Sequence, residues 1–274
     1  MIDKFDYEEP VCPLKGGKAF YYPESGVPLG RIPVARIIEK VDALFGKNDY
    51  VEAGRVLVYW KTEAMALKDK SGELAMESEL VGYYRKQNDR ENGLASAARA
   101  LALTDELGQA DMASGATVFI NCATAYKAFG MAEEALPLYR RAEQVYRRVL
   151  PSSDARYGGL YNNMALALVD LERYEEAEAA YRSALAVMER VPQGEAECAI
   201  TYINLAHMYE VCGKESDIKG CMAKAYELLQ SDNLPHDGYY AFVLEKCAPS
   251  FGYFGDTAIY EALKKESENI YARA

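Results

Sequence analysis

The chain has 274 residues, of which 50% are apolar and 27% are charged, so it can bury a large core. Its formal net charge is −11, which disfavours nucleic acid and anionic membranes as partners, because both attract basic proteins. The sequence contains no run of about 18 apolar residues and therefore predicts no membrane-spanning helix.

Residues 1–31 form an N-terminal arm without helical periodicity, because proline and glycine interrupt it throughout. Its first residues are acidic and lack an apolar core region, so we expect no secretory signal. Two interpretations of the arm remain open, a disordered tail and an extended segment packed on the rest of the chain. Phe20, Tyr21 and Tyr22 favour the second, since aromatic residues are rare in disordered segments.

Six cysteines are scattered along the chain, and none form a C-x-x-C pair. This spacing is typical of free, buried thiols in a reducing compartment, so we expect a cytoplasmic protein. The cysteines are Cys12, Cys122, Cys198, Cys212, Cys221 and Cys247.

Residues 32–232 contain a repeat with a period of about 42 residues. The first helix of each unit has a large apolar residue followed by a small or β-branched one. The second helix has two mostly small residues, four positions before and three positions after a residue that is aromatic in two units (Tyr139 and Tyr181) and is Ala97 or Met222 in the others. Small residues let antiparallel helices approach closely. The equivalent small positions in the first helices are Val81, Ala123, Ala165 and Ala206. The paired positions in the second helices are Gly93 and Ala100, Ala135 and Ala142, Ala177 and Ala184, and Ile218 and Ala225.

This pattern resembles the tetratricopeptide repeat, most clearly in NCATAYKAFGMAEEALPLYRRA (residues 121–142) and in residues 162–184, where Glu172 stands at the position of the turn glycine. The long period is similar to that of the kinesin light chain subclass. The resemblance implies an all-α, right-handed superhelical solenoid of antiparallel helix pairs. Residues 41–57 read as a degenerate first hairpin.

Residues 233–274 read as a degenerate sixth repeat followed by a capping helix, with Pro249 expected to end the first helix of that repeat. Over the whole chain we expect helices and almost no strand. The expected helices are near 32–45, 50–69, 73–87, 91–107, 111–129, 131–149, 154–171, 174–191, 195–212, 215–230, 238–247 and 257–272.

Three asparagines share one register position in successive first helices: Asn121, Asn163 and Asn204. Asparagine is a mediocre helix former, so its recurrence needs a reason. Its amide can hold the backbone of an extended peptide, and the resemblance implies the same role. The alternative is a structural bond between neighbouring repeats.

Other inward positions predict a polarised groove. Thr124 and His207 share the next position, and Arg85, Lys86 and Lys127 cluster in the N-terminal half. The three cations are suited to a carboxylate of a peptide, although solvated helix ends are an equally good explanation. The family's carboxylate-clamp residues are not reproduced.

No catalytic motif is present, and the two histidines, His207 and His236, lie far from any metal-ligand spacing. We therefore expect no metal, no cofactor and no enzyme activity. The predicted function is a scaffold that binds a peptide or protein segment in its groove. The alternative is a peptide sensor whose effector lies on another chain.

Overall fold

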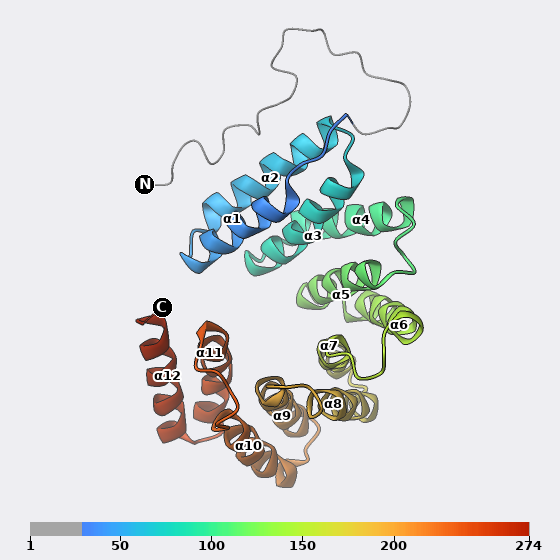
Figure 1. Cartoon of the computed structure of the whole chain (residues 1–274). Coiled ribbons are helices and arrows are strands. Elements are labelled where there is room, and N and C mark those ends of the chain that lie inside the picture. The colour runs from blue at the N-terminus through green and yellow to red at the C-terminus, as the bar shows by residue number, and fades with distance from the viewer. Residues whose placement is uncertain (1–28, 274) are drawn as a thin grey trace. The chain divides into compact units, whose positions relative to one another are not determined.

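The computed structural model describes residues 29–273, and these residues form two compact units that divide between Phe129 and Gly130. Most of the predicted arm therefore lies outside the described residues, and residues 29–33 contain no helix. The described part is helical without strands, as predicted (Figure 1). The first unit contains α1 (Val34–Gly46), α2 (Tyr50–Ala66), α3 (Lys70–Lys86), α4 (Arg90–Glu106) and α5 (Ala113–Ala128). The second contains α6 (Ala132–Val149), α7 (Arg156–Asp170), α8 (Tyr174–Met188), α9 (Glu195–Val211), α10 (Glu215–Leu229), α11 (Gly238–Tyr253) and α12 (Thr257–Tyr271).

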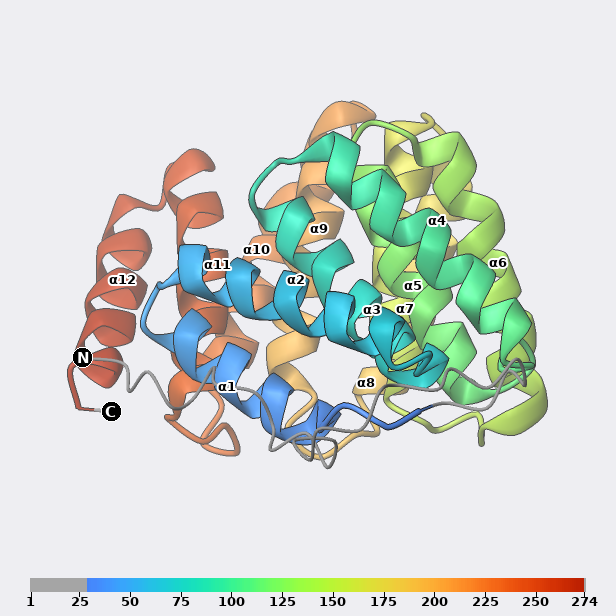
Figure 2. The same cartoon turned by 90° about the horizontal axis from the view of Figure 1, so that it is seen from above.

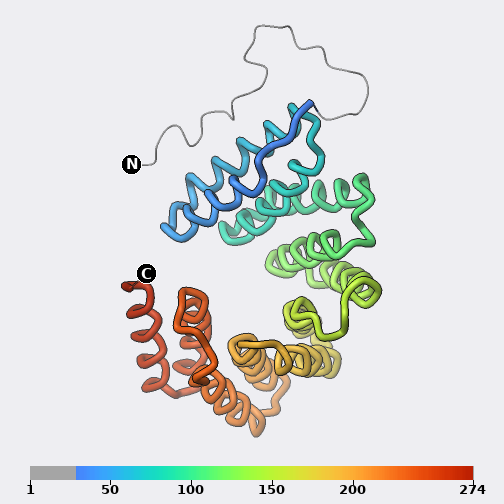
Figure 3. The backbone as a smooth tube through the Cα atoms, in the orientation of Figure 1, coloured from blue at the N-terminus to red at the C-terminus, as the bar shows by residue number. Residues whose placement is uncertain are grey.

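Consecutive helices pair as antiparallel hairpins within each unit. In the first unit α1 packs on α2 and α3 on α4, and Figure 2 shows α1 beside α2. In the second unit α7 pairs with α8, α9 with α10 and α11 with α12. The backbone reverses at each short turn (Figure 3). The predicted antiparallel helix pairs are confirmed in both units.

Turns between helices use a left-handed residue, as helix C-termini commonly do. Gly130, Gly213 and Gly255 have φ values of 77°, 74° and 97°. Glu172 occupies the equivalent turn with φ 57°, which confirms that a glutamate stands where the repeat pattern has glycine. In the first unit, aspartates follow such residues and cap the next helix. One of them is Asp69, whose carboxylate accepts from the backbone N–H of Gly72.

The small residues lie at the helix contacts, as predicted. Ala123, Ala165, Ala177 and Ala206 are fully buried. Tyr181, the aromatic residue between Ala177 and Ala184, is also fully buried and belongs to the core of the second unit. The small positions predicted from the sequence to lie at helix contacts are therefore buried in the structure.

One prediction about the helices was wrong. Pro249 lies inside α11, which continues to Tyr253 instead of ending near residue 247. Pro249 is on the exposed side of the helix, so water can bond the carbonyl that loses its N–H partner. The flanking residues Ala248 and Phe251 are buried and hold the helix together across the proline.

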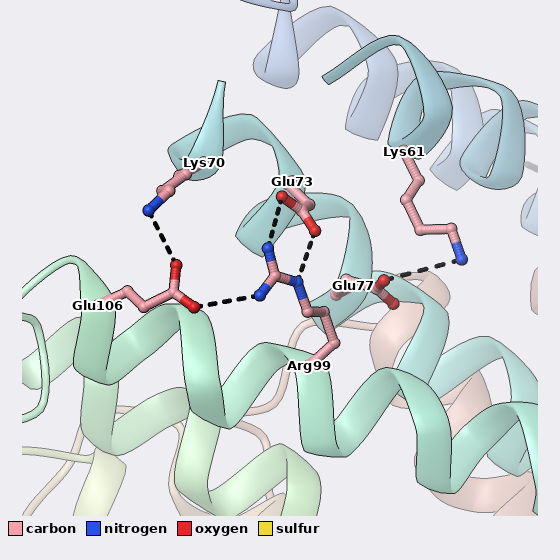
Figure 4. A network of polar contacts seen from close by, with 6 residues as sticks. All are labelled: Lys61, Lys70, Glu73, Glu77, Arg99 and Glu106. Atoms are coloured by element: carbon pink, nitrogen blue, oxygen red, sulfur yellow. Dashed lines mark hydrogen bonds and ion pairs between the residues drawn. The ribbon is translucent and has the colours of Figure 1, made fainter. Parts of the chain in front are cut away.

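A network of ion pairs links three helices of the first unit (Figure 4). The Arg99 guanidinium of α4 donates two hydrogen bonds, of 2.7 and 3.1 Å, to the Glu73 carboxylate of α3. The same guanidinium lies 3.2 Å from Glu106, which also pairs with Lys70 at 3.0 Å. These contacts fix α3 against α4.

Glu77 is the least satisfied member of this network. It is 5% exposed, its Oε1 lies 3.7 Å from Lys61 Nζ, and its Oε2 accepts no hydrogen bond within the described residues. Burial raises the pKa of Glu77 above its ordinary value of 4.5, against the opposing effects of Ser96 and Lys61. A raised pKa in the folded state means that Glu77 favours folding below its ordinary pKa. This contribution is lost as the pH rises through the folded-state pKa.

We therefore expect Glu77→Gln to raise the urea midpoint at pH 7.5 and to have little effect at pH 4.5. Trp60 fluorescence is a suitable probe, because this single tryptophan lies in α2 of the same unit. Glu106→Gln is the control, and we expect it to lower the urea midpoint at pH 7.5. The reason is that the hydrogen bond from Lys70 lowers the pKa of Glu106. A lower midpoint for Glu77→Gln at pH 7.5 would contradict this account.

Candidate peptide-binding surfaces

The first helices of successive hairpins pack on one another in each unit. In the first unit α3 packs on both α1 and α5, and in the second α9 packs on both α7 and α11. The second helices of neighbouring hairpins, such as α8 and α10, have no comparable contact. Because only the first helices meet closely, their row forms the inner side of each unit's curvature, which is where repeat solenoids present binding surfaces.

The eight predicted site residues fall into two groups on these inner rows. Five belong to the first unit and three to the second. Those of the first unit are Arg85 and Lys86 in α3 and Asn121, Thr124 and Lys127 in α5. Those of the second unit are Asn163 in α7 and Asn204 and His207 in α9.

In the first unit, Asn121 and Arg85 have side chains available for a ligand. Asn121 is exposed, Arg85 is half-buried, and neither side chain bonds or pairs with another described residue. The Lys86 ammonium lies 5.0 Å from the centre of the Phe45 ring, which holds it near the end of α1. Thr124 Oγ1 donates to the Ile120 carbonyl at 2.8 Å, and Lys127 is half-buried.

Gly82 leaves an open space in this surface. It lies in α3 at the register position of Thr124, and a Cβ built on it meets no atom within 4 Å. A glycine in a helix interior costs about 0.5–1 kcal/mol relative to alanine. Here the absence of a side chain leaves space on the surface, and no neighbouring group of the fold occupies that space.

In the second unit, Asn204 takes part in a contact between repeats. Its Nδ2 donates to Asn162 Oδ1 of α7 at 3.1 Å, and Thr201 Oγ1 donates to the same oxygen at 3.3 Å. Asn162 is 8% exposed, so these bonds satisfy a buried amide. A structural role for asparagine was one of the two predicted roles, but Asn162 was not among the predicted residues. The signal for it is its position 42 residues before Asn204. Asn163 is half-buried, and its amide bonds to no described side chain.

His207 of α9 contacts α11. Its Nε2 is 2.9 Å from Ser250 Oγ, and its ring centre is 4.9 Å from that of Phe254. The side chain remains 41% exposed and so can also contact a ligand. Residues 29–273 contain no group of three or more His, Cys, Asp or Glu side chains placed to hold a metal ion.

An aromatic face of α11, next to His207, was not predicted from the sequence. Tyr239, Phe242 and Tyr253 are 49%, 51% and 65% exposed and lie on one side of the helix. Tyr253 donates to Glu210 Oε1 at 2.8 Å, and Tyr239 donates to Glu197, so each phenol binds a carboxylate of α9. The sequence signal for this face is the spacing of three residues from Tyr239 to Phe242 and of eleven from Phe242 to Tyr253, within the segment predicted to be a degenerate repeat.

The described cysteines are free, and four of the five are buried, as predicted. Burial raises the pKa of Cys122, Cys198 and Cys247 to about 12 and that of Cys221 to about 11. These thiols are therefore protonated near neutral pH and act as small apolar side chains. Cys12 lies outside the described residues, and among residues 29–273 no helix combines the length and apolar character that crossing a membrane requires.

Comparisons with known proteins agree with this geometry. A model of the tetratricopeptide repeat family matches residues 157–231, which include most of α7 and all of α8 to α10. A search of curated protein sequences found no match.

The chain also matches solved structures, and the first of those named here has a similar fold. A putative kinesin light chain with nearly identical TPR-like repeats, from Podosopora anserina, is 15% identical with a TM-score of 0.54, over 73% of this chain and 95% of that chain. BtubC (BKLC) from P. vanneervenii is 20% identical with a TM-score of 0.49, over 89% and 92%. A tetratricopeptide repeat protein from Parabacteroides merdae is 18% identical with a TM-score of 0.42, over 86% and 93%. Residues 157–231 therefore match the tetratricopeptide repeat family, and the helix pairs of the chain have a fold similar to that of kinesin light chain-type repeats.

Proposed function

We propose that the protein is a non-enzymatic scaffold that binds a peptide or protein segment on the inner rows of first helices. Tetratricopeptide repeats generally bind protein partners, which supports the general role, and the groove is our specific assignment. The observation that carries it is an amide in each unit that bonds to no described side chain, Asn121 in the first and Asn163 in the second, together with the open space above Gly82 in the first unit.

The amides supply what an extended peptide needs. Each asparagine side chain offers one acceptor and two donors, which suit the N–H and C=O groups of a peptide backbone. In the first unit, Arg85 adds a guanidinium that pairs with no described carboxylate and can bind that of a ligand with two hydrogen bonds. We therefore propose that a ligand of the first unit has an acidic group near Arg85, Lys86 and Lys127 and that Thr124 contacts it nearby. In the second unit we propose that His207 contacts a bound segment.

Asn204 has a different place in this proposal. Its Nδ2 already holds Asn162, so a ligand would contact its remaining polar atoms. The free, largely buried thiols support a reducing compartment, and we propose a cytoplasmic location on that basis.

A groove-filling experiment tests this function. We expect the double variant Gly82→Leu, Gly159→Leu to lose at least tenfold in affinity for protein partners captured from a lysate of the source cells, because leucines fill the inner surface of both units. A Cβ at Gly159 of α7 also meets nothing within 4 Å, so the fold itself tolerates both changes. Binding is measured by quantitative mass spectrometry of the captured proteins.

Gly220→Leu is the matched control. Gly220 lies inside α10, a second helix, is exposed, and has no atom within 4 Å of a built Cβ. All three substitutions remove a helical glycine, and only the double variant changes the inner rows. Equal capture by the double variant and the control would exclude the groove as the binding surface.

A further inference from the structure

An exposed apolar stripe runs along α2 in the first unit. Val51, Val58 and Met65 are 75%, 39% and 55% exposed. They lie seven residues apart and so share one face of the helix, whereas the buried Leu57 and Ala64 lie on another. Large apolar side chains aligned on an exposed face mark a docking surface.

The stripe leads into an open pocket of about 560 Å³ between α2 and α3. Gly54 helps to form this pocket, because a Cβ at Gly54 would overlap the phenol of Tyr83. Tyr83 therefore lies against α2 and forms one wall. Its ring contacts that of Tyr84 edge-on at 5.2 Å, which extends the aromatic wall. The side chains that line the pocket include Val51, Arg55, Val58, Tyr59, Tyr83 and Tyr84.

The described chain begins at the opposite end of the same helix. The backbone N–H of Leu29 donates to the Leu67 carbonyl at 2.8 Å, directly after the end of α2. The N–H of Ile32 donates to Asp69 Oδ2 at 3.0 Å. These two bonds fix residue 29 beside the C-terminal end of α2, which is the end of the helix that carries Met65.

The length of the preceding segment matches the surface. From Met65 to Val51 the helix extends about 21 Å, at 1.5 Å per residue. Residues 20–28 reach about 30 Å when extended, at 3.3 Å per residue. This length is enough to pass the end of α2 and to bring Phe20, Tyr21 and Tyr22 to the pocket.

The chemistry of the segment also suits the surface. FYY (residues 20–22) provides three consecutive aromatic side chains for an aromatic-walled pocket. Glu24, the one charged residue of the segment, is opposite in charge to Arg55, whose side chain is 75% exposed although it pairs with Glu52 at 2.7 Å. The remaining residues of the segment add no charge that would oppose docking.

We propose that residues 20–28 dock on the α2 stripe of the same chain, with the aromatic side chains of residues 20–22 in the pocket beside Tyr59 and Tyr83. Docking covers the exposed apolar side chains of α2, a second helix, and uses none of the residues proposed above to contact a ligand. It therefore does not depend on the function proposed above.

Cysteine cross-linking in the full chain tests the docking. The pair Tyr21→Cys and Val51→Cys is introduced after Cys12→Ser and Cys212→Ser remove the thiols that are not known to be buried. Under mild oxidation we expect an intrachain disulfide at least ten times faster than in the control pair Tyr21→Cys and Val211→Cys. Val211 is also well exposed, at 62%, but lies in α9. Equal rates overturn the proposal, and so does a disulfide between two chains, which would show that a second copy occupies the surface instead.

Dye binding provides a second test without cysteines. We expect the triple variant Phe20→Ser, Tyr21→Ser, Tyr22→Ser to bind an apolar fluorescent dye at least twofold more than the wild type, because it uncovers the stripe. Phe5→Ser with Tyr7→Ser is the control, since it removes aromatic residues outside the docking segment. An unchanged dye signal in the triple variant overturns the proposal.

Discussion

Replacing Tyr181 with alanine is expected to destabilise the second unit by about 3–5 kcal/mol. Tyr181 is fully buried between Ala177 and Ala184 in α8, in the core that α8 shares with α9. Truncation leaves a cavity that rigid helix pairs cannot close. Urea unfolding followed by far-UV circular dichroism measures the loss, seen as a lower midpoint.

Tyr181→Phe is the informative companion. The Tyr181 hydroxyl is buried and has no hydrogen-bond partner within the described residues, and burial raises its pKa above the ordinary value. An unsatisfied buried hydroxyl costs about 1–3 kcal/mol, so its removal should raise the free energy of unfolding. The ring stabilises the fold by filling the core, whereas the buried hydroxyl destabilises it. We therefore expect Tyr181→Ala to lower the free energy of unfolding and Tyr181→Phe to raise it. A Phe variant as unstable as the Ala variant would contradict this.

The second large effect is expected at Gly194, in the loop before α9. A Cβ there would overlap the backbone carbonyl oxygen of Met188 and lie 3.0 Å from that of Val191. Both neighbours are backbone atoms, so the loop must shift to accept the methyl group. We expect Gly194→Ala to destabilise the protein by about 1–3 kcal/mol, as other overpacked sites do.

Gly159→Ala and Gly220→Ala are the controls for this prediction. Both glycines lie inside helices and have open space around a built Cβ. Alanine in these positions should stabilise the protein by about 0.5–1 kcal/mol through helix propensity. Thermal unfolding of the three variants distinguishes the two cases by the sign of the shift in Tm. A rise in Tm for Gly194→Ala would show that the loop accommodates the methyl group.

Most of the fold was predictable because one physical constraint repeats. Close packing of antiparallel helices needs small residues at fixed points, so Ala123, Ala165 and Ala206 revealed the register without any structure. Helix ends followed from turn residues in the same way. Pro249 was misread because its effect depends on which side of the helix it faces, and this side is set by packing.

The candidate site was less predictable, because it depends on what each side chain already contacts. Asn163 and Asn204 share a register position, yet of these two only Asn204 is engaged by Asn162 within the described part of the chain. The sequence shows equal asparagines, and the difference arises from the neighbouring helix. Exposed aromatic residues such as Phe242 were missed because an apolar residue in a helix is read first as core.

Site-specific photo-cross-linking tests the central claim most directly. The photoreactive amino acid p-benzoylphenylalanine replaces Asn121 of α5 or Asn163 of α7, both on the inner rows. Controls carry it at the exposed positions Asn92 of α4 and Ser183 of α8, on second helices. The account predicts that bound partners cross-link from Asn121 or Asn163 and not from the controls. Cross-links from Asn92 or Ser183 alone would contradict it and place the partner on the second helices.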